Sequence, residues 1–151
     1  MENNSLKKLD SMLRSFMTVF AFIYSIGLLP SCRKASTETL NEMIADGGMI
    51  KYSGNFSGAY NQQVTGLAKI VLINNKYQLK LENFSTDNGP DLKVYLSKKD
   101  LPNEFISVGS IKSTNGNQVY EISGTPDFTV YKYVLIHCER YNHLFGRAEL
   151  R

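Results

Sequence analysis

Apolar residues recur at every second position over most of the chain after residue 49, and this period of two constrains the fold more than any other feature. Tyr77, Leu79 and Leu81, for example, are separated by polar residues. Alternation of this kind gives a β-strand one apolar and one polar face. The pattern predicts about eight strands, at residues 50–56, 66–73, 77–84, 92–97, 105–112, 118–123, 130–138 and 144–150.

Turn-forming residues separate these predicted strands. Asn74 and Asn75 lie between two strand patterns and predict a hairpin, because Asn tolerates left-handed backbone geometry. Short strands with regular turns favour an all-β domain over residues 49–151, folded as an antiparallel β-sandwich or small barrel. The other predicted turns are Asn88-Gly89-Pro90-Asp91, residues 115–117 and residues 124–127.

The N-terminal region has the pattern of an export signal. Lys7, Lys8 and Arg14 form a basic start, followed by an uncharged, mostly apolar run at residues 16–29. A membrane-spanning helix needs about 20 apolar residues, so this shorter run suits the apolar region of a signal peptide. An uncleaved anchor and a buried core helix are the alternative interpretations.

The sequence Leu29-Pro30-Ser31-Cys32 resembles a bacterial lipobox, and similar patterns occur in Bacteroidetes-type lipoproteins. The resemblance implies cleavage of a signal peptide at residues 1–31 and attachment of a diacylglycerol to Cys32. It thereby predicts a protein anchored to a membrane by lipid, at the periplasmic face or at the cell surface. Residues 32–48 then form the lipidated terminus and a polar tether, with one short helical turn near residues 40–44.

Composition and motifs exclude several classes of function. The net charge is +3, and the basic residues are scattered rather than gathered in a stripe, so a nucleic-acid partner is not expected. Phosphate-binding glycine loops, Ser-His-Asp sets and Cys-x-x-Cys pairs do not occur in the sequence. No paired general acid and base stand out, so enzymatic activity is not predicted. No motif indicates a particular cofactor.

Several sequence blocks, in order, resemble the DM-thirteen (DM13) domain, which occurs beside DOMON domains in Skeletor-like animal proteins and alone in bacterial lipoproteins. The resemblance spans about residues 50–150. Its most specific blocks are Asn88-Gly89-Pro90-Asp91-Leu92 and the C-terminal series of Cys138, Phe145-Gly146 and Ala148-Glu149-Leu150.

The resemblance implies an accessory role in extracytoplasmic electron transfer or redox chemistry, with Cys138 as the redox residue. The surroundings of Cys138 would be shaped by Tyr141, His143, Phe145 and Gly146. The implied partners are the membrane, through the lipid anchor, and another redox or binding protein of the cell envelope.

From the residues alone, Cys138 has several possible roles. If Cys32 is acylated, Cys138 is an unpaired thiol in an oxidising compartment, where it is a free reactive thiol, an intermolecular disulfide or a metal ligand. It also follows Val134 and Ile136 on an apolar face, which favours an inert core residue. The spacing to His143 resembles a copper-binding loop. His137, however, points away from Cys138 on the same strand, so no metal site is predicted.

The second hypothesis is a non-catalytic binding or structural module of the cell envelope. Tyr131 and Tyr133 are candidates for a surface that holds a protein or glycan, although cross-strand aromatic pairing is the more common role of such residues. This hypothesis predicts a buried, unreactive Cys138 and an exposed aromatic or apolar patch.

Overall fold

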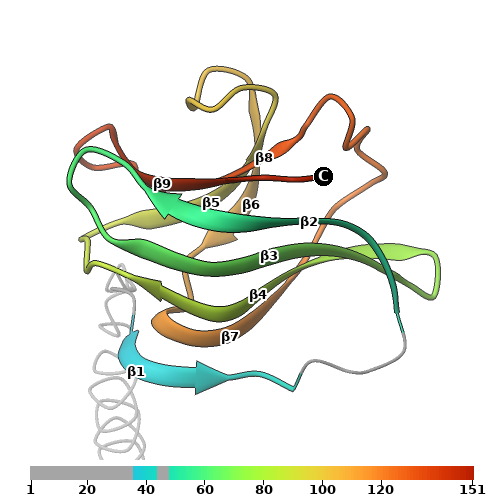
Figure 1. The fold of residues 1–151 in the computed structure, drawn as a ribbon, viewed down its shortest axis with the longest axis horizontal. Coiled ribbons are helices and arrows are strands. Elements are labelled where there is room, and N and C mark those ends of the chain that lie inside the picture. Colours follow the sequence, from blue (N-terminus) through green and yellow to red (C-terminus); the bar gives the residue numbers. More distant parts are fainter. Residues whose placement is uncertain (1–35, 44–47) are drawn as a thin grey trace, which may run out of the picture. The chain divides into compact units, whose positions relative to one another are not determined.

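The computed structural model describes residues 36–43 and 48–151, and every regular element in this part of the chain is a β-strand (Figure 1). The all-β prediction is confirmed. The predicted signal peptide at residues 1–31 and Cys32 lie outside the described residues. The strands are β1 Ser36–Asn41, β2 Met49–Gly58, β3 Val64–Ile73, β4 Lys76–Thr86, β5 Leu92–Ser97, β6 Phe105–Ser110, β7 Ser113–Glu121, β8 Tyr133–Cys138 and β9 His143–Glu149.

The strands form one curled sheet in the order β1-β7-β4-β3-β2-β9-β8-β5-β6. Strand β2 joins the two halves, because Met49–Asn55 pair with β3 whereas Phe56–Gly58 pair with β9. The sheet therefore folds over on itself like half of a barrel, as the two stacked halves in Figure 1 show. This arrangement agrees with the predicted sandwich or small barrel. Among the described residues, no helix is long and apolar enough to cross a membrane.

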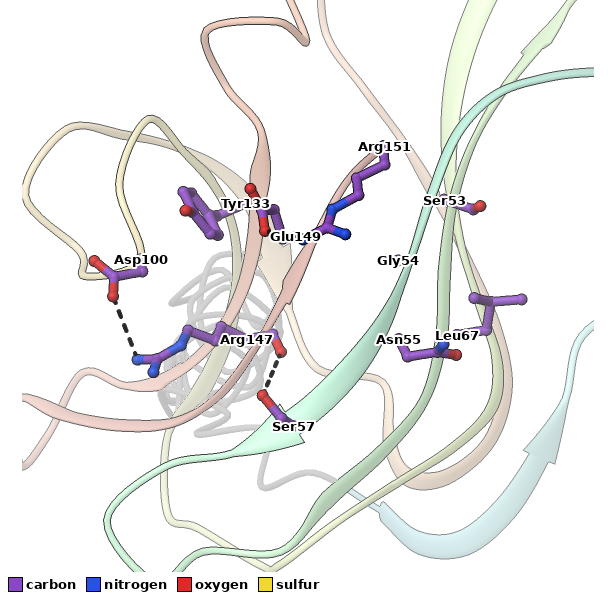
Figure 2. A pocket seen from close by; sticks show the side chains of 10 residues that line it. All are labelled: Ser53, Gly54, Asn55, Ser57, Leu67, Asp100, Tyr133, Arg147, Glu149 and Arg151. Carbon is purple, nitrogen blue, oxygen red and sulfur yellow. Dashed lines mark hydrogen bonds and ion pairs between the residues drawn. The ribbon is translucent and has the colours of Figure 1, made fainter.

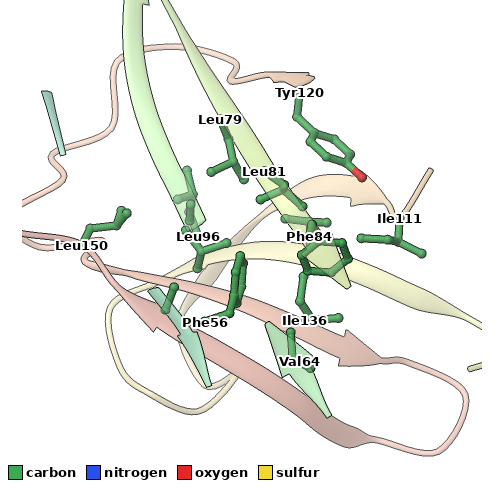
Figure 3. Close-up of a cluster of buried hydrophobic side chains, with 14 of the residues drawn as sticks. Phe56, Val64, Leu79, Leu81, Phe84, Leu96, Ile111, Tyr120, Ile136 and Leu150 are labelled. Carbon is green, nitrogen blue, oxygen red and sulfur yellow. The ribbon is translucent and has the colours of Figure 1, made fainter. Parts of the chain in front are cut away.

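The main hydrophobic core lies between the two halves of the sheet (Figure 3). The rings of Phe56 and Phe84 meet edge to face with their centroids 5.4 Å apart. Leu81 from β4 and Ile136 from β8 reach the same space from opposite halves, and both are fully buried. Burying each large apolar side chain contributes roughly 1.5–3 kcal/mol, so this interior holds the curled sheet together.

Two of the predicted turns are confirmed. Asn74 and Asn75 have φ angles of 48° and 61°, as a tight hairpin between β3 and β4 requires. Asn88-Gly89-Pro90-Asp91 lies between β4 and β5, which are not neighbours in the sheet. This second turn therefore carries the chain from one half of the sheet to the other.

The predicted turn at residues 115–117 is wrong, since these residues lie inside β7. Gly116 has a φ of 101°, and a Cβ at this position would lie 1.8 Å from the carbonyl oxygen of Leu40 in β1. The glycine reflects a close approach by another strand rather than a reversal of the chain, and the sequence pattern does not distinguish these two causes.

Strand β1 lies in the segment that the sequence predicts as a tether. Leu40 and Asn41 belong to this strand, so the predicted helical turn near residues 40–44 is wrong at these two positions. β1 pairs in parallel with β7, and the carboxylate of Glu42 accepts hydrogen bonds from Lys112 Nζ and from the backbone N–H of Val119. These contacts, rather than the local sequence, make this short polar segment a strand. Because the partners are distant in sequence, the local pattern does not predict it.

The strand predicted from residue 130 begins instead at Tyr133. The backbone N–H groups of Val130 and Tyr131 both donate to the carbonyl oxygen of Asp127, and the Asp127 carboxylate accepts from Thr129. A tight turn capped by an aspartate therefore occupies the first part of the apolar run.

Candidate functional site

Cys138 is the last residue of β8, and its side chain lies in the main core with no exposed surface. Val134 and Ile136 face the same core, as the alternation of the strand predicts. Cys138 pairs across the sheet with Leu92 of β5 and with His143 of β9. The sequence left open whether this thiol is exposed, and the structure places it as a free, buried cysteine.

The blocks that carry the DM13 resemblance meet at this end of the fold. Leu92 pairs with Cys138, and a Cβ on Gly89 would lie 2.7 Å from Leu92 and 3.0 Å from the ring of Phe145. The carbonyl oxygen of Asp91 accepts a hydrogen bond from the N–H of Glu139. The turn before β5 is thus closely packed against the residues that surround the end of β8.

The predicted surroundings of Cys138 are only partly brought together. His143 and Phe145 are in contact, with their ring centroids 5.7 Å apart, and His143 also lies 5.6 Å from the ring of Tyr60. Tyr141 is 71 % exposed in the turn after β8.

Gly146 in β9 pairs with Gly58 of β2 and lies close to Val64 of β3. A Cβ at this position would lie 2.7 Å from both the carbonyl oxygen of Ser57 and the side chain of Val64. A side chain at this position would therefore disturb the close packing of β9 against β2 and β3.

His137 faces away from Cys138, on the opposite side of the sheet, as predicted. It lines a pocket of about 380 Å³, is only 5 % exposed, and has an Nδ1 atom without a hydrogen-bond partner. Burial lowers the pKa of His137 below its usual range, which favours the neutral imidazole. The pocket is lined by Tyr60, Leu101, Pro102, Asn103, His137, Asn142, His143 and Leu144.

A mononuclear copper site at Cys138 does not fit this geometry. His137 and Cys138 point to opposite faces of β8, and the described residues contain no cluster of three or more His, Cys, Asp or Glu side chains able to hold a metal. The spacing from Cys138 to His143 is thus explained by a β8–β9 hairpin.

A comparison with known protein families agrees with the packing of the DM13-like sequence blocks against one another. Residues 55–150 match the family model described as "Electron transfer DM13". The chain belongs to the DM13 electron-transfer family. No curated protein and no solved structure matches it significantly.

The DM13 domain also contains a polar network that the sequence did not reveal. The hydroxyl of Tyr95 in β5 donates a hydrogen bond to the carboxylate of Glu139, just after β8. Lys93 forms an ion pair of 2.9 Å with Asp91 and lies 3.9 Å from Glu139. The alternation in β5 places Tyr95 opposite to Val94 and Leu96, but its partner is 44 residues away and has no local sequence signal.

A polar groove of about 500 Å³ crosses β2, β8 and β9 of the DM13 domain (Figure 2). Arg147 lies 3.7 Å from Asp100, and Arg151 lies 2.9 Å from Glu149. The half-buried Tyr133 also lines the groove, whereas Tyr131 packs against the main core. The two tyrosines therefore do not form one continuous surface.

Proposed function

We propose that this chain is a lipid-anchored electron-transfer accessory domain of the cell envelope, which exchanges single electrons with another envelope protein. The observation that carries the proposal is the match to the electron-transfer family over residues 55–150. Anchoring rests on the lipobox-like Leu29-Pro30-Ser31-Cys32, whose acyl chains would hold the domain at a membrane surface.

In this proposal Cys138 is the redox-responsive residue, and its burial limits the chemistry. Thiol–disulfide exchange requires direct attack by a thiolate on a sulfur atom, which a side chain without exposed surface cannot make. Disulfide exchange by the folded domain is therefore not part of the proposal.

The first experiment compares the redox titration of the full-length protein with that of Cys138→Ala. We expect the wild type to show a difference between its oxidised and reduced forms, and the variant to lose this difference while keeping its circular dichroism spectrum. Identical titrations would show that Cys138 is a packing residue only.

A second measurement tests whether the folded domain protects Cys138, by the rate at which iodoacetamide alkylates this thiol. We expect folded protein to react at least about a thousandfold more slowly than the urea-unfolded chain, since reaction would require opening of a domain of ordinary stability. Equal rates would identify an exposed thiolate and return disulfide exchange to the proposal.

Two observations favour a second candidate, a module that binds envelope glycans: the burial of Cys138, which this hypothesis predicts, and the polar groove. Planar Arg and carboxylate groups beside Tyr133 offer hydrogen bonds and one aromatic edge to a hydroxyl-rich ligand. Calorimetry with acidic oligosaccharides tests this candidate. Binding that is lost in Arg147→Gln but kept in Lys76→Gln, a residue that does not line the groove, would support it. No heat of binding would exclude it.

A further inference from the structure

Tyr95 combines a buried ring with a carboxylate that accepts its proton in a hydrogen bond. The side chain is 1 % exposed, and its hydroxyl donates to Glu139 Oε1. The Glu139 side chain is itself 48 % exposed, so the carboxylate connects the buried phenol to solvent. Lys93 lies 3.9 Å from the second carboxylate oxygen of Glu139.

The ring of Tyr95 also has an aromatic route to the surface. Phe105 of β6 stacks on it with centroids 4.0 Å apart and an interplanar angle of 18°. Phe105 is 43 % exposed, and β6 is an edge strand of the sheet. A partner that docks on this edge would approach within one aromatic ring of Tyr95.

The surroundings of Tyr95 oppose a charged phenolate. Burial, and then the hydrogen bond to Glu139, raise the pKa of Tyr95 well above its usual range. Loss of an electron together with the proton avoids this penalty, because the product is a neutral phenoxyl ring. The same site that disfavours ionisation is therefore compatible with one-electron oxidation.

We propose that Tyr95 is a redox-active tyrosine of this domain, an inference that rests on the proposed electron-transfer function. One electron leaves the ring for a strong one-electron oxidant of the ferryl-haem or peroxyl-radical class, which is reduced. At the same time the O–H bond of Tyr95 breaks and its proton forms a new O–H bond on Glu139. Reduction of the phenoxyl radical returns the proton from Glu139 to Tyr95.

Tyr120 provides a matched comparison within the same chain. It is also buried, but its hydroxyl donates to the amide oxygen of Gln118 at 2.7 Å. An amide oxygen accepts hydrogen bonds but is too weak a base to take up the phenol proton. A redox role set by burial alone would include Tyr120. A role that depends on a carboxylate would not.

The test uses the full-length protein with a photogenerated ruthenium(III) tris-bipyridine oxidant, followed by transient absorption and electron paramagnetic resonance. We expect a long-lived tyrosyl radical in the wild type and in Tyr120→Phe, and its loss in Tyr95→Phe. Glu139→Gln should slow formation about a hundredfold, the lower range of what a positioned proton acceptor contributes. Circular dichroism establishes that each variant is folded.

A long-lived radical that persists in Tyr95→Phe would overturn the inference, as would an unchanged rate in Glu139→Gln. Failure here is distinguishable from failure of the proposed function. If the redox titration still depends on Cys138 while Tyr95 is inert, only the role of Tyr95 is lost. If the wild type shows neither response, both proposals fail.

Discussion

At the residue scale, two neighbours on β8 meet opposite environments. Cys138 is enclosed in the main core, whereas His137 lies on the other face beside Tyr95, with ring centroids 5.7 Å apart. A strand places successive side chains on opposite faces, so this separation follows directly from the sequence. The sequence does not show that both side chains are buried, because their burial requires the turn and loop residues that cover each face.

The buried His137 predicts a pH dependence of stability. Because burial lowers its pKa in the folded protein below the usual 6.5, the unfolded chain binds a proton more readily. The free energy of unfolding should therefore fall as the pH drops from 7.5 to 5.5, and His137→Gln should flatten this slope. Urea denaturation at several pH values between 5.5 and 7.5 measures this change in the free energy of unfolding.

His143→Gln is the control for this measurement, because it removes the other histidine of the chain, which lines the same pocket, and keeps His137 itself. It should keep most of the slope. An equal slope in wild type and His137→Gln would mean that His137 does not titrate differently in the two states.

At the element scale, β1 shows how tertiary contacts create a strand. The Glu42 carboxylate, held by Lys112 and the Val119 N–H, fixes its end to β7. Burial acts to raise the pKa of Glu42, but the hydrogen bonds from Lys112 and Val119 together lower it. The carboxylate is therefore charged at neutral pH and holds a strand whose own sequence has no β pattern.

Gly116→Ala should detach β1. The new Cβ would collide with the Leu40 carbonyl oxygen, and the residue has a φ of 101°. We therefore expect the free energy of unfolding to fall by about 3 kcal/mol, at the upper end of the cost of local backbone strain. Hydrogen exchange of residues 36–41 should accelerate more than that of β3.

Gly124→Ala is the control for the backbone effect alone, since Gly124 also has a positive φ but has open space around it. It should lower the free energy of unfolding by about 1 kcal/mol and leave the hydrogen exchange of β1 unchanged. Equal effects of the two substitutions would show that strain, rather than contact with β1, explains Gly116.

At the scale of the whole molecule, the curled sheet brings distant segments together. Asp91 accepts from Glu139, Tyr95 donates to Glu139, and Gly89 packs against Phe145, across 44 to 56 positions of sequence. Both candidate centres, Cys138 in the core and Tyr95 on the opposite face, depend on the same pairing of β5 with β8.

The proposed anchor makes a prediction for the complete chain. Expressed in a bacterium that processes lipoproteins, the wild type should incorporate labelled palmitate and fractionate with membranes. Cys32→Ser should lose the label, because the chain would lack the acylated thiol.

Cys138→Ser is the control, since it alters the other of the two cysteines, and it should keep the label. Label retained by Cys32→Ser would contradict the anchor, and label lost from Cys138→Ser would place the acyl chain on the wrong residue.

The sequence by itself determined the all-β class, the hairpin at Asn74-Asn75, a turn at Asn88–Asp91 and the opposite facing of His137 and Cys138. These features follow from local periodicity and backbone preference. Only the tertiary structure decided that β1 is a strand, that residues 115–117 are not a turn, and that Tyr95 meets Glu139. Each of these depends on a partner far along the chain, and local patterns carry no information about which distant segment will approach.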